Sequence, residues 1–227
     1  MTVYADRASR IWDLVQKGLG RAGRALGPLC DAYRPAGASD PLSLANRFLR
    51  LPAAFAPHGG KWDRPQGYGQ AMWDGLFDTA YTRPGDYIVR RESEAGAADG
   101  GIWFVATQQK LLPPLCIRAS RVVTFARAPM AQAAGLNGYG GVTTLARTAL
   151  LRDWPASVLD SGANGAYQAD LPTDTSLGSW SVLLPRLPDI VLKAGDFMTD
   201  DLGRTGVVGA AELSELGWRL NVKQAAT

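Results

Sequence analysis

Residues 18–23 (Gly-Leu-Gly-Arg-Ala-Gly) have the spacing of a site that binds a dinucleotide, G-x-G-x-x-G. That chemistry requires a strand before the glycines and a βαβ unit around them, so that the pyrophosphate meets a helix N-terminus. Here the residues before Gly18 have helical periodicity, and residues 29–40 show no pattern of a second strand. We therefore interpret the glycines as part of a helix and expect no bound nucleotide.

The other candidates for chemistry are a carboxylate, one histidine and two cysteines. Residues 160–162 (Asp-Ser-Gly) match the motif of aspartic proteases, which need two such carboxylates, and the chain holds one copy. His58 is the only histidine and lies in a turn-rich loop, and Cys30 and Cys116 have no neighbours at zinc-ligand spacing. We expect no catalytic, cofactor-binding or metal-binding residues, and a protein that is not an enzyme.

The composition is that of a folded protein, with 46% apolar and 20% charged residues in 227. No apolar run approaches the roughly 20 residues that a membrane-spanning helix requires. The N-terminus shows neither an apolar segment nor a cleavage site typical of a secretory signal. We expect no membrane span and folding in the cytoplasm, where both cysteines are reduced and buried.

The first element expected is an amphipathic helix over residues 3–26, with an apolar face opposite a basic one. Residues 1–34 hold six Lys/Arg against three Asp/Glu, and residues 35–227 hold eighteen of each, so the first segment carries the whole net charge of +3. A basic face suits an acidic protein surface, nucleic acid or anionic lipid, or is simply solvated; of the functional readings we favour a protein partner. The helix residues that we expect at a subunit interface are Arg7, Arg10, Ile11, Trp12, Val15 and Leu19.

Residues 31–70 are predicted to form an extended, loop-rich arm, because prolines interrupt every longer pattern. Only Leu42–Leu51 is expected to be helical there, with Asp40 as its N-cap and Pro41 at its first position. A long segment with little internal structure usually lies on another surface. We therefore expect Trp62 and Trp73 at an interface.

From Tyr81 onward the apolar period changes to two, which is typical of strands. In the last strand Trp218, Leu220 and Val222 share one face, and a turn containing Gly203 precedes it. The strands predicted are 86–90, 101–107, 116–126, 142–147, 179–184, 190–193, 196–199, 205–210 and 217–223.

Parts of the middle of the chain recur near its end. We interpret this as duplication of a β-module, with chance similarity of two hairpins as the alternative. The predicted matches are residues 85–89 with 195–199, 101–106 with 206–210, and 116–118 with 217–220.

The same tracts carry a resemblance to a known family. Residues 85–87, 104–106, 111–118 and 121–123 resemble a family of virion proteins of tailed phages and prophages of proteobacteria. Residues 195–197, 200–204, 212–213 and 217–220 are similar to small β-barrel head-closure and neck proteins. The resemblance covers approximately residues 80–127 and 155–224 and brings no catalytic residues with it.

The expected fold is α+β, mainly β. An N-terminal helix and arm (1–70) precede two small antiparallel β-barrel or sandwich-like modules (71–150 and 151–227). The resemblance implies a structural virion component that forms a ring in the head–tail connector or neck, links head and tail, and conducts DNA. Its implied partners are copies of itself, adjacent portal, adaptor or tail proteins, and DNA in the channel, in a virion assembled in the host cytoplasm.

Other functions stay open from the sequence alone. One is a structural protein of the tail tube, nozzle or baseplate. Another is a receptor- or carbohydrate-binding tail module that uses exposed aromatic side chains as sugar platforms. A virion-associated hydrolase is the enzymatic alternative, and it would need a pocket that holds His58 beside an acid.

Overall fold

The computed structural model describes residues 2–59, 71–91, 100–128, 147–160, 178–187 and 189–224, without the side chains of residues 2–8. One helix, α1 (Thr2–Leu26), precedes the strands, so the expected α+β, mainly β class is confirmed. The first half contains β1 (Leu29–Tyr33), β2 (Arg47–Pro52), β3 (Ala54–Pro57), β4 (Met72–Leu76), β5 (Tyr87–Arg90), β6 (Gly101–Thr107) and β7 (Leu115–Ala119). The second half contains β8 (Arg121–Arg127), β9 (Thr148–Asp160), β10 (Ser179–Leu184), β11 (Phe197–Asp200), β12 (Thr205–Ser214) and β13 (Gly217–Gln224).

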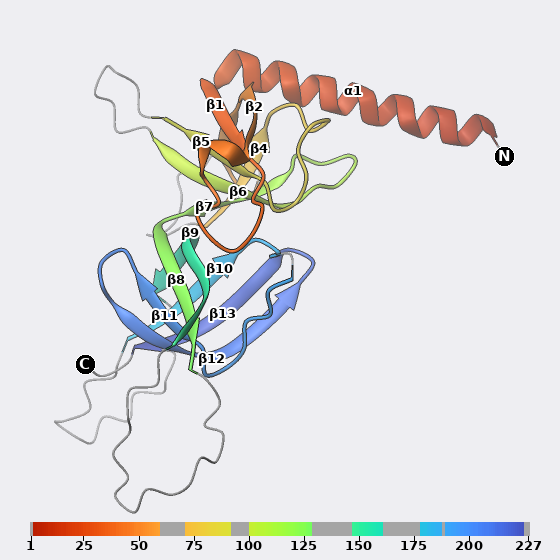
Figure 1. Ribbon diagram of the computed structural model, residues 1–227. Helices are drawn as coiled ribbons and strands as arrows, with labels where there is room; N and C mark the ends of the chain where they lie inside the picture. The colour runs from red at the N-terminus through yellow and green to blue at the C-terminus, as the bar shows by residue number, and fades with distance from the viewer. Residues whose placement is uncertain are drawn as a thin grey trace, which may run out of the picture.

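The strands form two modules, one above the other in Figure 1. The first is an antiparallel sheet in the order β2-β1-β5-β6-β7-β4-β3, and its two edge strands are consecutive in the chain, separated only by Ala53. The second is a closed barrel in the order β10-β13-β12-β11-β8-β9. There β9 is one long strand, whose first part pairs with β8 and whose last four residues pair with β10.

The two modules have the same topology. When β2 and β3 are taken together as the equivalent of β9, the strands β1 to β7 match β8 to β13 in chain order, in neighbours and in direction. The first module is therefore the same barrel interrupted at Ala53. The repeated strand order that a duplication predicts is therefore present, and it extends over both modules rather than over single hairpins.

The strand registers confirm the equivalence at single residues. Tyr87 pairs with Tyr33 and Phe197 pairs with Ala126, so the two aromatic residues occupy the same place, as predicted. Pro52 and Pro155 are likewise equivalent, since they pair with the matching residues of β1 and β8.

Both modules also carry a register shift at the same place in the sheet. It lies between Val105 and Thr107 of β6, and between Val208 and Ala210 of β12. A β-bulge bends the strand that contains it and increases its twist. The repeat of this irregularity shows that the two modules share curvature as well as strand order.

The predicted matches between the later strands are out of register. Cys116 pairs with Val105, and Val222 pairs with Val208. Because Val105 and Val208 precede the same register shift, the equivalent of Cys116 is Val222. The predicted match of Cys116 with Gly217 is wrong. The reason is the connection between the strands. The β12–β13 hairpin closes with a short turn, whereas β6 and β7 are joined by a longer loop. A comparison of the two sequences alone therefore aligns β7 with β13 in the wrong register.

The extended arm predicted for residues 31–70 is wrong where the structure describes it. Residues 29–57 contain the strands β1, β2 and β3. The strand β1 was not predicted because it is buried along nearly its whole length and so lacks the alternation that marks a half-exposed strand. The helix predicted for Leu42–Leu51 is wrong: only Leu44–Asn46 form a 3-10 turn, whose N-cap is Ser43 and not Asp40, and the residues from Arg47 onward pair with β1 as strand β2. The expected strand 190–193 does not form, and 142–147 lies mostly outside the described residues.

The expected strand 116–126 is two strands that meet at Ser120, β7 in the first module and β8 in the second. The sheets therefore change at Ser120, not at the predicted division after residue 150.

One hydrophobic core cluster contains Tyr87 and Phe104 of the first module with Trp154 and Leu220 of the barrel. The Tyr87 hydroxyl donates a buried 2.8 Å hydrogen bond to the Pro155 carbonyl. One core cluster consequently spans the two modules, and a second lies within the first module alone.

The predicted helix is present as α1, and its C-terminal half lies against β2, β3 and β4. Glycines make this contact close: a Cβ atom on Gly23 would lie 2.4 Å from the Leu76 carbonyl oxygen, and one on Gly27 would lie 2.0 Å from that of Ala53. The N-terminal half extends beyond the sheet (Figure 1). Gly23 and Gly27 thus let the helix pack closely on the sheet, and we call this contact the glycine seat. Residues 18–23 are helical, as predicted.

Candidate functional site

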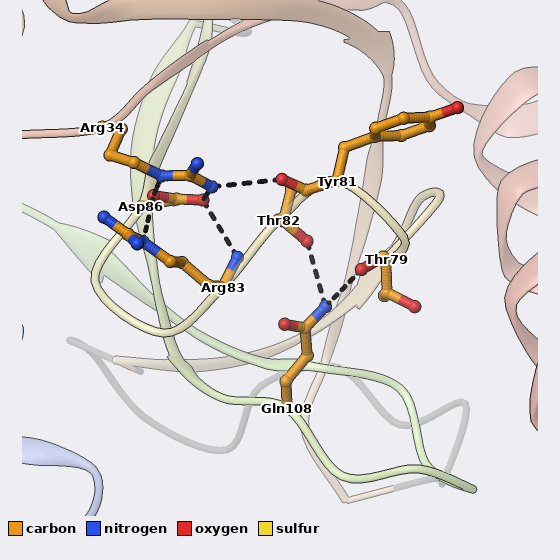
Figure 2. Close-up of polar contacts among 7 residues, drawn as sticks. All are labelled: Arg34, Thr79, Tyr81, Thr82, Arg83, Asp86 and Gln108. Atoms are coloured by element: carbon orange, nitrogen blue, oxygen red, sulfur yellow. Dashed lines mark hydrogen bonds and ion pairs between the residues drawn. The ribbon is translucent and has the colours of Figure 1, made fainter.

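A buried ion pair organises the turn that leads into β5. Asp86 is almost fully buried, and both of its carboxylate oxygens accept hydrogen bonds from Arg34, at 2.9 Å from Nε and 2.7 Å from Nη2 (Figure 2). Oδ2 also accepts from the backbone N–H of Arg83, and Arg34 donates to the Tyr81 carbonyl. Gly85 occupies the left-handed position of this turn with a φ of 97°. This bidentate pair of charged hydrogen bonds raises the pKa of Arg34 and fixes the turn against β1.

The same arrangement recurs in the barrel. Asp196 accepts from Arg127 Nε at 2.7 Å and Nη2 at 2.9 Å, and from the backbone N–H of Lys193. Arg127 donates further to the Val191 carbonyl, and Gly195 has a φ of 90°. We call each unit of one buried aspartate, its arginine and the preceding glycine turn an Arg–Asp clamp. The structural repeat therefore includes a polar arrangement as well as the strand order.

A cleft of about 420 Å³ lies beside the first clamp, between the two modules. The first module contributes Arg34, Arg83 and Asp86 to its wall, and the barrel contributes Trp154, Arg186 and Glu215. Gln108 holds the loop behind this wall by donating to the Thr79 carbonyl and to the Thr82 hydroxyl (Figure 2). Asp86 is already neutralised by Arg34. The cleft therefore presents arginines and one glutamate, without a nucleophile paired to a base.

The predicted interface residues of α1 divide into two groups. Ile11 and Trp12 are exposed, with 51% of Ile11 accessible, and Lys110 of the β6–β7 loop lies 5.6 Å from the Trp12 ring centre. Val15 and Leu19 are half-buried, nearer the seat on the first sheet. Leu14, which the sequence analysis did not select, is 68% exposed.

The remaining predicted interface residues are scattered. Arg10 is exposed on the same helix, whereas the side chain of Arg7 and all of Trp62 lie outside the described part of the molecule. Trp73 lies in β4 between Pro57 and Cys116, half-buried against the core of the first module. The structure thus groups the α1 residues and separates Trp73 from them.

The sequence motifs that suggested chemistry have structural places. His58 is exposed, and its Nδ1 lies 2.8 Å from Asp74, but it is not among the residues that line the cleft. Residues 18–23 lie inside α1, and Asp160 ends β9. Cys30 and Cys116 are buried free thiols; burial raises the pKa of Cys30 to about 11 and that of Cys116 further. Both are therefore neutral and protected near pH 7.

Within the described ranges, no three His, Cys, Asp or Glu side chains gather as metal ligands. In the same part of the chain, no helix has the length and apolarity needed to cross a membrane.

Neither Arg–Asp clamp was predicted from the sequence. A signal existed, since the basic-x-Gly-Asp-aromatic pattern of residues 83–87 recurs at 193–197. The arginine partners could not be found in this way, because Arg34 and Arg127 are distant in the chain and only the pairing of β1 with β5 and of β8 with β11 brings them near.

No family model, curated protein or solved structure matches this chain.

Proposed function

We propose that this protein is a structural virion subunit of a tailed phage that assembles into a ring of the head–tail connector or neck. The observation that carries the proposal is the projecting half of α1. Its apolar side chains Ile11 and Leu14 are exposed on a helix that is held at its other end by the glycine seat. The resemblance of residues 85–87 and 195–197 to virion proteins supplies the virion and its ring as the setting.

The body of the molecule suits a mechanical role. One apolar core cluster spans both modules, a second fills the first module, and each module has a buried aspartate whose two oxygens are held by an arginine. Buried, fully bonded charged networks rigidify the segments that they join. Such a body transmits the position of one interface to another, which is what a ring between two larger assemblies requires.

The projecting helix suits the role of a latch between subunits. α1 has 25 residues and is therefore about 37 Å long. Its C-terminal half cannot rotate or lift without separating the backbones at Gly23 and Gly27 from the sheet. The N-terminal half consequently points in a fixed direction and offers an apolar face to a neighbouring copy. A contact between two different surfaces of identical chains closes into a ring when its rotation permits.

The test is the assembly state of the purified protein, by light scattering after size exclusion and by negative-stain imaging. We expect rings for the unaltered chain and monomers for Ile11→Asp with Leu14→Asp. Leu202→Asp is the matched control, because Leu202 is also exposed and apolar but lies in the turn before β12. Rings that survive the helix substitutions would contradict the latch, and an unaltered chain that stays monomeric at high concentration would contradict the proposed function.

A further inference from the structure

A third buried aspartate differs from the two in the clamps. Asp31 lies in the middle of β1 with 4% of its side chain exposed, and three arginines surround it. Arg50 Nε lies 2.6 Å from Oδ1, Arg91 Nε lies 3.0 Å from Oδ2, and Arg47 Nη1 lies 3.8 Å from Oδ2. We propose that Arg47, Arg50 and Arg91, here called the arginine patch, bind phosphate groups of the backbone of double-stranded DNA.

Asp31 has more arginine partners than the other buried aspartates of the described residues. Asp196 and Asp200 each have an ion pair with a single arginine. Asp86 has an ion pair with Arg34 at 2.7 Å and a longer one with Arg83 at 4.0 Å. One arginine is therefore enough to neutralise a buried aspartate in this protein. Asp31 has two more, which leaves the patch with a net charge of about +2 on a small area.

The barrel lacks an equivalent of the arginine patch and its aspartate. By register, the residue of the barrel that corresponds to Asp31 is Thr124, because Tyr33 and Ala126 pair with the equivalent residues Tyr87 and Phe197. The barrel forms the same strands without an aspartate at this position. The fold therefore does not require the patch, and its presence in the first module alone points to a role outside folding.

The exposure of the guanidinium groups also favours a phosphate partner. A guanidinium is a planar fork with five N–H donors, and Arg50 uses Nε to donate to Asp31 Oδ1, which leaves the N–H donors of its Nη groups for another partner. Arg91 lies 3.0 Å from Oδ2 as an ion contact. Arg50 and Arg91 are 52% and 62% exposed, so both guanidinium groups reach solvent. Two parallel N–H donors match a phosphate group, for which arginine is the preferred side chain.

Double-stranded DNA fits the patch better than an acidic protein does. DNA carries one negative charge per roughly 1.7 Å of its axis, so several phosphates can meet three guanidinium groups that share one carboxylate. The inference rests on the proposed function, because a ring between head and tail surrounds the DNA path. Contacts to phosphate alone carry no sequence information. We therefore expect binding that depends on salt and not on sequence.

The experiment measures binding of the full-length protein to labelled duplexes of unrelated sequences by fluorescence anisotropy, between about 50 and 200 mM salt. Arg50→Gln and Arg91→Gln should each weaken binding about tenfold and lower the salt slope by about 1. Each single change leaves two arginines beside Asp31, and thermal unfolding confirms that the variant is folded. Arg219→Gln, on the outer face of β13, removes the same charge from the barrel and should change affinity less than about twofold.

Equal binding by the patch variants and the unaltered chain would overturn the inference, and so would binding to anionic lipid vesicles without binding to DNA. The two proposals fail separately. Rings without DNA binding would overturn the arginine patch and leave the structural function standing. Patch-dependent DNA binding by a protein that stays monomeric would support the patch and contradict the ring.

Discussion

At the scale of single residues, buried aspartates with arginine partners fix the turns of both modules. Asp200 illustrates the balance: burial raises its pKa, but hydrogen bonds from Arg204 and from the backbone N–H of Leu202 together bring that pKa below its ordinary value. The carboxylate has four such contacts, from the backbone N–H groups of Leu202 and Arg204 and from Nε and Nη2 of Arg204. Protonation of Asp200 would weaken all four.

This lowered pKa predicts acid sensitivity of the barrel. A group with a depressed folded-state pKa stabilises the fold above its unfolded value of about 3.9, and that contribution is lost as the pH falls through the folded value. We expect the free energy of unfolding, measured with urea, to fall below about pH 4. Asp200→Asn should be less stable than the unaltered protein at pH 7 and should lose less on acidification. An equal acid loss in both proteins would show that Asp200 is not responsible.

Trp218 is the second test at this scale. It is 5% exposed in the shared core and lies in phase with Leu220 and Val222, as the alternation predicted. Trp218→Ala should cost about 3–5 kcal/mol in the free energy of unfolding. Arg219→Ala, one residue further on the outer face, should cost less than about 1 kcal/mol. Thermal and urea unfolding measure both, and a fully stable Trp218→Ala protein would contradict the assigned face.

At the scale of elements, the seat of α1 depends on residues without side chains. A Cβ atom on Gly23 would lie 2.4 Å from the Leu76 carbonyl oxygen, which is too close for contact, whereas one on Gly18 would meet nothing within 4 Å. Gly23→Ala should therefore lift the helix and raise its hydrogen exchange. Gly18→Ala is the matched control and should stabilise the helix by up to about 1 kcal/mol. Similar exchange in both variants would contradict the seat.

Elements with a clear period were predictable, and elements without one were not. The apolar period of α1 and the alternation of β13 follow from burial of one face, and both were predicted. β1 was missed because it is buried on both faces and contains Asp31, whose charge is compensated only by distant arginines. The clamps and the arginine patch were not predicted for a related reason. Their aspartates and arginines are ordinary residues in the sequence, and only the strand order makes them sites.

At the scale of the whole molecule, the two modules are expected to unfold together. Their strands belong to separate sheets, but one core cluster runs through both, from Tyr33 and Phe104 to Trp154 and Val182. A shared core couples the stability of the parts that bury it. Urea unfolding should therefore give coincident transitions by tryptophan fluorescence and by far-ultraviolet circular dichroism. Two separated transitions would show that the modules are independent.

The coupling should weaken when one hydroxyl is removed. Tyr87 and Phe197 are equivalent by register, but only Tyr87 reaches the other module, where its hydroxyl donates to the Pro155 carbonyl at 2.8 Å. Tyr87→Phe keeps the ring and leaves that carbonyl without its buried donor, which should cost about 1–2 kcal/mol in the free energy of unfolding. The reciprocal Phe197→Tyr adds a hydroxyl to a half-buried ring and should change stability by less than about 0.5 kcal/mol. Equal stabilities of the two variants would mean that this hydrogen bond does not couple the modules, and that apolar contact alone joins them.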